Sequence, residues 1–131
     1  MVDELNSCAT LSTDAELEAA LSESFERPVV LLKHSEWCSV SERAIEAARG
    51  EIEEWAKRIG CRIVVVQNQR ELCDSIARRL GIRHETPQIL VIRNGRAVWD
   101  ASHAGITESS VRRALEAALA GTLVPAQPDR P

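Results

Sequence analysis

The sequence predicts an α/β domain in which helices cover both faces of a central, mixed β-sheet. Two short apolar runs, Val29–Leu32 and Ile63–Val66, have the length and composition of strands that are buried on both faces. A helical segment separates these runs, so the two strands should run parallel. A third apolar run, Ile89–Ile92, leads through Asn94-Gly95 into a fourth strand, which is the pattern of a tight antiparallel hairpin.

Four helices are expected around these strands. Thr13 and Glu16 have the spacing of a capping box and predict where the first helix begins, and Thr107 should cap the last helix. Gly60 and Gly81 are expected to end the second and third helices. The predicted helices span residues 14–24, 39–59, 69–80 and 108–120.

The resulting order is helix, strand, helix, strand, helix, hairpin and helix. This is the order of the thioredoxin-like fold, with a four-stranded sheet and an extra N-terminal helix. We expect a single domain over residues 13–120, preceded by a flexible N-terminus at 1–12 and followed by a loose, proline-rich tail at 121–131.

Composition limits the possible functions. The chain has 131 residues, 44% of them hydrophobic, which suits one packed domain. The net charge of -4, with basic and acidic residues mixed, argues against binding to nucleic acid or to an acidic membrane. The first residues do not have the pattern of a signal peptide, so we expect a cytoplasmic protein whose four cysteines are free, catalytic or buried rather than in structural disulfides.

One cysteine lies where reactive thiols are favoured. Cys38 follows the first predicted strand and precedes the second helix, where unpaired N–H groups and the helix dipole stabilise a thiolate. Ser41, one turn later, can donate a hydrogen bond to the sulfur but cannot form a disulfide with it. Trp37 either shields the sulfur, offers a flat face to a partner, or packs beside the junction. The alternative for Cys38 itself is a buried, inert thiol.

A second feature is Thr86-Pro87, which precedes the third predicted strand. In a thioredoxin-like fold this position is a cis-proline loop that faces the cysteine. The backbone of Thr86 would then be free to pair with an extended substrate. The other three cysteines are assigned as follows: Cys73 to a buried helix face, Cys61 to the core, and Cys8 to the flexible N-terminus.

Three segments together resemble the YtxJ-type monothiol bacilliredoxins: KHSEWCSVS around Cys38, RHETPQ at 83–88, and WDASHAGIT at 99–107. The resemblance covers about residues 14–120. It implies a thioredoxin-like fold and a protein that removes bacillithiol, a low-molecular-weight thiol, from mixed disulfides on cytosolic proteins. By position, Cys38 is then the nucleophile and Thr86 and Pro87 form the cis-proline loop. The implied site-lining residues are Lys33, His34, Trp37, Ser41, His84, Gln88 and His103.

The sequence departs from the family at Ser39, where members commonly have proline. Serine leaves an N–H available in the first turn and can alter the reactivity of Cys38. The expected partners are S-thiolated proteins and bacillithiol or another small thiol, and no metal site is predicted from the spacing of the histidines and cysteines. Three alternatives stay open: a redox sensor, binding of an iron–sulfur cluster with a small thiol, and a redox-inert binding module.

Overall fold

The computed structural model describes residues 8–36 and 39–121. Its elements follow the order β1 (Ala9–Thr10), α1 (Asp14–Glu23), β2 (Val29–His34), α2 (Ser39–Glu54), β3 (Gly60–Val65), α3 (Arg70–Leu80), β4 (Gln88–Arg93), β5 (Arg96–Ser102), a 3-10 turn (His103–Gly105) and α4 (Glu108–Ala120). The five strands form one sheet in the order β1-β3-β2-β4-β5. The predicted α/β architecture is confirmed, with one strand more than the four expected.

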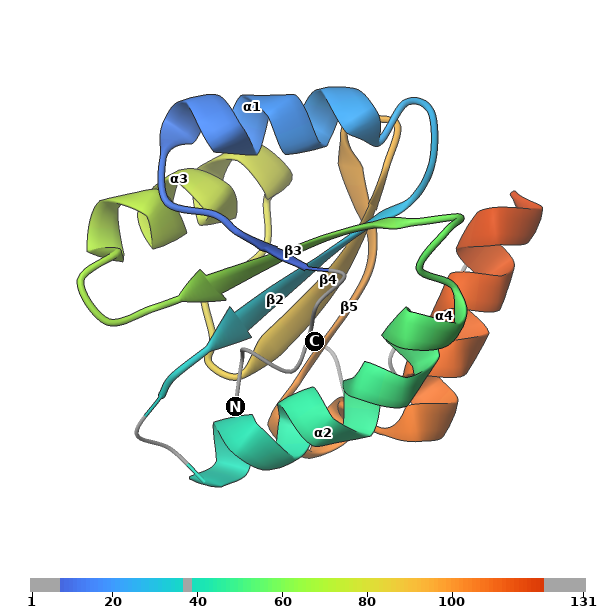
Figure 1. The fold of residues 1–131 in the computed structure, drawn as a ribbon. Coiled ribbons are helices and arrows are strands. Elements are labelled where there is room, and N and C mark those ends of the chain that lie inside the picture. The colour runs from blue at the N-terminus through green and yellow to red at the C-terminus, as the bar shows by residue number, and fades with distance from the viewer. Residues whose placement is uncertain (1–7, 37–38, 122–131) are drawn as a thin grey trace.

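Helices cover both faces of the sheet (Figure 1). Helices α1 and α3 lie on one face, and α2 and α4 lie on the other. Alternate residues of β2 divide between the two cores: Val30 and Leu32 pack toward α2 and α4, whereas Val29 and Leu31 pack toward α1 and α3. Strand β2 pairs parallel with β3 and antiparallel with β4, so it occupies the centre of the sheet.

Local sequence signals account for most element ends. Thr13 and Thr107 each accept a hydrogen bond from a first-turn N–H in a capping box, as predicted. Gly81 ends α3 at a φ of 67°, and the hairpin turn has positive φ at Asn94 and Gly95. These conformations favour glycine and asparagine, which explains why the sequence marks them clearly.

The expected end of the second helix and start of the third are wrong. Helix α2 ends at Glu54 rather than Ile59, because the chain tightens into turns in which Ala56 N–H bonds Glu53 and Arg58 N–H bonds Trp55. Gly60 does not cap this helix but begins β3, where a Cβ atom would lie 2.5 Å from Glu23 Oε2. The third helix starts after Gln69 rather than Asn68.

The extra strand, β1, lies in the N-terminal segment, and it brings together two cysteines that were expected to be unpaired. Its two residues pair parallel with Arg62 and Ile63 of β3, and Leu11 beyond it is buried. This pairing places Cys8 beside Cys61, with Cα atoms 4.5 Å apart, and the two form a disulfide. The expectation that all four cysteines are unpaired is therefore wrong for Cys8 and Cys61, although Cys61 lies in the core as predicted.

Candidate functional site

Four segments of the chain meet at the carboxyl end of β2. Strand register places Lys33 opposite Gln88, and Gln88 opposite Ser102, while His34 lies opposite Val65. The Thr86-Pro87 loop, the turn at 103–105 and the residues after β3 therefore surround the connection from β2 to α2. This is the edge at which open α/β sheets commonly bind ligands. The predicted nucleophile Cys38 and its neighbour Trp37 lie outside the described residues.

The two residues that follow β2, Ser35 and Glu36, are held by a glutamine that no sequence motif marks. The Gln67 side-chain amide donates to Ser35 Oγ at 2.7 Å, and its carbonyl oxygen accepts from the Glu36 N–H at 3.4 Å. Gln67 follows β3 just as Ser35 follows β2, and neighbouring parallel strands end at the same edge. The contact between Gln67 and Ser35 could therefore be inferred only from the adjacency of the two strand ends, and not from a sequence motif.

Ser41 supports the same connection from the first turn of α2. Its side chain is fully buried, and its Oγ accepts the Ser35 N–H at 3.3 Å. The hydroxyl proton is not used in that bond and can be donated elsewhere. Ser41 therefore helps to hold the segment that leads to Cys38, in addition to occupying the position where a second cysteine would stand.

The Thr86-Pro87 peptide bond is cis, and the loop is held by two neighbouring side chains. The Gln88 amide donates to the Arg83 carbonyl at 3.1 Å and to Ser102 Oγ at 3.4 Å. His103 Nε2 lies 3.2 Å from the Thr86 carbonyl oxygen. Because a carbonyl oxygen only accepts, His103 carries its proton on Nε2 in this contact.

His103 joins the loop through its backbone as well. Its N–H donates to the Pro87 carbonyl at 3.1 Å, and its φ of 54° lies in the left-handed region that a non-glycine residue seldom adopts. The expectation that the Thr86 backbone is entirely free needs correction, since its carbonyl already accepts the His103 bond. The second lone pair of that oxygen remains for another donor.

Lys33 and His34 are both buried but on opposite faces of β2. Lys33 is 1% exposed and its Nζ lies 3.1 Å from Nδ1 of the exposed His84. Burial lowers the pKa of Lys33, while the acidic side chains of Cys73 and Asp100 act in the opposite direction. The two predicted site residues Lys33 and His84 are thus in direct contact.

His34 is 3% exposed, and its Nδ1 has no hydrogen-bond partner among the residues that the structure describes. Burial lowers the pKa of His34, and burial together with Lys33 lowers the pKa of His84. Both imidazoles are therefore held neutral in the folded protein at pH values where the unfolded chain begins to take up protons.

This difference predicts a loss of stability in mild acid. As the pH falls through about 6.5, the unfolded chain binds protons that the folded His34 and His84 reject, and the buried His34 contributes a loss of up to about 1.4 kcal/mol per pH unit. Urea unfolding at pH 7.5, 6.5 and 5.5 measures the slope. We expect His34→Phe to flatten it, and the exposed His103→Gln variant serves as a control. Equal slopes for the His34→Phe variant and the original protein would contradict the assignment.

The remaining cysteine, Cys73, is free and 3% exposed. Burial raises the pKa of its thiol, although Lys33 acts in the opposite direction. A buried thiol with a raised pKa forms little thiolate and is a poor nucleophile. The predicted location of Cys73 on a buried helix face is confirmed.

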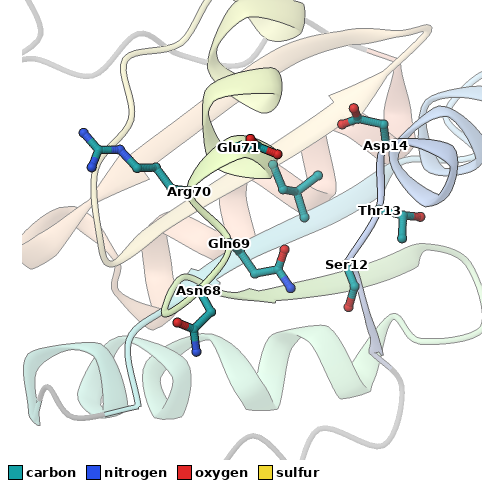
Figure 2. Close-up of a pocket in the computed structure, with 8 residues that line it drawn as sticks. Ser12, Thr13, Asp14, Asn68, Gln69, Arg70 and Glu71 are labelled. Carbon is teal, nitrogen blue, oxygen red and sulfur yellow. The ribbon is translucent and has the colours of Figure 1, made fainter.

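A hollow of about 450 Å³ lies between the first turns of α1 and α3 (Figure 2), lined by Ser12–Asp14 and by residues 68–72. None of the predicted site residues lines it. In the described ranges, no group of three or more His, Cys, Asp or Glu side chains could hold a metal ion. No helix there is both long and apolar enough to cross a membrane.

The comparisons with known proteins agree with the fold. Residues 9–111 match the family model described as monothiol bacilliredoxin BrxC. One similar solved structure has a thioredoxin fold and has been suggested to be an oxidoreductase; it is 32% identical, with a TM-score of 0.73 and coverage of 82% of this chain and 92% of that chain. Thioredoxin from Fasciola hepatica is 19% identical, with a TM-score of 0.69 and coverage of 84% and 98%. Thioredoxin from Malassezia sympodialis is 16% identical, with a TM-score of 0.68 and coverage of 85% and 90%.

Proposed function

This chain belongs to the monothiol bacilliredoxin family, and we propose that it removes bacillithiol, or a similar small thiol, from mixed disulfides on cytosolic proteins through Cys38. The family membership establishes a thiol-based redox role. The identity of the small thiol, the nucleophile and the order of steps are our proposal.

The observation that carries this proposal is Ser41. A dithiol enzyme would need a second cysteine one helical turn after Cys38, and the buried Ser41 hydroxyl is committed there to the Ser35 N–H. Cys8 and Cys61 are joined to each other, and Cys73 is buried. None of the described cysteines is thus a ready resolving thiol, so a second small thiol must reset Cys38.

The proposed cycle has two exchange steps. The Cys38 thiolate attacks the small-thiol sulfur of the mixed disulfide, the S–S bond breaks, and the client protein leaves as a thiolate that takes up a proton. The small thiol is now disulfide-bonded to Cys38. A second small thiolate attacks its sulfur, releases a symmetric small-molecule disulfide and regenerates the Cys38 thiolate. The client is reduced and two small thiols are oxidised, so electrons balance.

The surrounding residues favour these steps. Helix α2 is 16 residues long and begins immediately after Cys38, so its N-terminal N–H groups can stabilise the thiolate. Glu42 in its first turn opposes that effect. We assign Thr86 and Pro87 to the surface facing the substrate. His103 and the buried Gln88 hold that loop, and Trp37 lies beside the sulfur in this assignment. Lys33, His34 and His84 complete the assigned set.

We assign this reaction to the cytoplasm, where mixed disulfides with small thiols are formed and reduced. Fractionation of the source cells tests the location, and recovery of the protein mainly outside the cytosolic fraction would argue against it.

A choice between two substrates tests the proposed reaction. We expect the protein to release client thiol from a model protein carrying one bacillithiol mixed disulfide, with turnover only when free bacillithiol is supplied. The same protein should leave the disulfides of insulin intact under these conditions. Reduction of insulin, or single-turnover release unaffected by added bacillithiol, would contradict a monothiol cycle.

A further inference from the structure

The Cys8–Cys61 disulfide follows from the register of β1 on β3. Ala9 lies opposite Arg62, so one step back along the same parallel register brings Cys8 opposite Cys61. The two Cα atoms are 4.5 Å apart and the two sulfurs are bonded. The pairing of the strands thus holds both cysteines in place for the bond, and the bond in turn fastens the edge strand to the sheet.

This pair of cysteines lies away from the edge at which the proposed reaction occurs. Cys61 is opposite Val30 near the start of β2, whereas Val65 is opposite His34 at the carboxyl end of that strand. Four residues of extended chain separate these two levels by about 13 Å. The disulfide therefore exchanges with molecules that arrive from solution, and not with a thiol at the reaction edge.

The two sulfurs of the bond differ in their access to solvent. Cys61 is 3% exposed in the core beside α2 and α4, whereas Cys8 is half-buried against the same core. A small thiolate from solution therefore reaches the Cys8 sulfur more readily. The Cys61 thiolate released by this attack would lie among apolar side chains, where a charge is poorly solvated. Exchange is consequently favoured when β1 moves away from β3.

Strand β1 is short enough to depend on the bond. It has two residues, both exposed, and just beyond it the Leu11 N–H donates to the Ile63 carbonyl at 2.9 Å. The buried side chain of Leu11 anchors the end of the segment nearest α1. A strand of two residues contributes little stability by itself. The disulfide therefore decides how firmly the other end of the segment is held.

We propose that Cys8 and Cys61 are a second, reversible thiol–disulfide pair that responds to the small thiols of the cell, and that reduction of this pair releases β1 from β3. The proposal goes beyond the function given above and does not involve Cys38. It uses the assigned cytoplasmic location, because disulfides that form in that compartment are usually transient and have catalytic or redox-sensing roles.

Reduction of the pair takes two exchange steps. A small thiolate attacks the Cys8 sulfur, the bond to Cys61 breaks, and the Cys61 thiolate takes up a proton. A second small thiolate attacks the small-thiol sulfur now bound to Cys8, releases a small-molecule disulfide and leaves Cys8 as a thiol. The pair gains two electrons and two protons, and two small thiols are oxidised. Once β1 is released, β3 forms this edge of the sheet.

A variant whose only cysteines are Cys8 and Cys61, made by Cys38→Ser with Cys73→Ser, tests reversibility. Equilibration at glutathione concentrations of about 0.1 to 10 mM and one fixed concentration of glutathione disulfide sets the redox condition. Alkylation after acid quenching and intact-mass spectrometry then measure the oxidised and reduced forms. We expect their ratio to change about a hundredfold for each tenfold change in glutathione, because two thiols react. A pair that stays in one state throughout this range would overturn the proposal.

Amide hydrogen exchange tests the release of β1. We expect the Leu11 N–H to exchange at least about tenfold faster in the reduced protein than in the oxidised protein, and well ahead of the amides of β4, which report unfolding of the whole domain. The variant Cys8→Ala is the matched control, and it should exchange at the fast rate with or without reductant. If Leu11 exchanges together with β4 in both states, reduction does not release β1.

These outcomes stay separate from those that test Cys38. Because the two-cysteine variant lacks Cys38, its redox behaviour is independent of the proposed exchange cycle. A reversible pair in a protein that forms no adduct on Cys38 would support this inference while the proposed function fails, and an adduct beside an unresponsive pair would have the opposite meaning. Should the variant with Cys73→Ser not fold, peptide mapping of alkylated Cys38→Ser gives the same ratio.

Discussion

Cys38→Ser is expected to reduce release of client thiol by at least about a thousandfold, to the uncatalysed rate. The attacking species in thiol–disulfide exchange is a thiolate, and a serine hydroxyl neither ionises near neutral pH nor forms a disulfide. The initial rate of client thiol release, measured at a fixed bacillithiol concentration, checks this expectation.

The matched control is Cys73→Ser. Cys73 is free but 3% exposed, and burial raises the pKa of its thiol, so its removal should leave the rate within about twofold after correction for any unfolded fraction. A large loss of rate in Cys73→Ser, in protein shown to be folded, would instead indicate that Cys73 resolves the mixed disulfide on Cys38.

Loss of the Cys8–Cys61 disulfide is expected to have the largest effect on stability. The bond joins residues separated by 53 positions and ties β1 to the edge of β3. Constraining an unfolded chain over such a loop contributes about 2–4 kcal/mol. Cys8→Ala should therefore lower the free energy of unfolding by that amount in denaturant titrations under non-reducing conditions. Cys8 is the better position to change, because Cys61 lies in the core and its replacement would also alter packing.

Reduction provides an independent control for the disulfide. With excess dithiothreitol, the original protein should unfold at the same denaturant concentration as Cys8→Ala, and the variant itself should be insensitive to the reductant. If the original protein unfolds at the same point with and without reductant, although mass spectrometry shows the disulfide to be present and then lost, the bond contributes nothing to stability.

The sequence predicts the elements whose ends depend on local chemistry. Capping by Thr13 and Thr107, the left-handed end of α3 at Gly81 and the Asn94-Gly95 hairpin all depend on conformations that few residue types adopt. Buried strands are equally easy to predict from the sequence, because their apolar runs are continuous. The fold class followed from these signals and from the order of the elements.

What the sequence did not predict depends on contacts between distant segments. Strand β1 has two residues, too few for any periodicity, so the proximity of Cys8 to Cys61 could not be inferred. Gln67 was not predicted because it acts through Ser35, a neighbour brought close by the sheet register. His103 was predicted to line the site, but its contact with the Thr86 carbonyl was not. At the candidate site, the sequence identified Lys33 and His84 individually, but only the structure shows that they touch.

The central claim is that Cys38 alone carries the small thiol, and intact-mass spectrometry tests it most directly. The original protein and Cys38→Ser would each be exposed briefly to bacillithiol disulfide, and the modified position mapped by peptide analysis. We predict one bacillithiol adduct, on Cys38, which is absent from the variant and is removed by further bacillithiol. No adduct on Cys38, or equal labelling of several cysteines, would contradict the account and favour cluster binding or a redox-inert binding module.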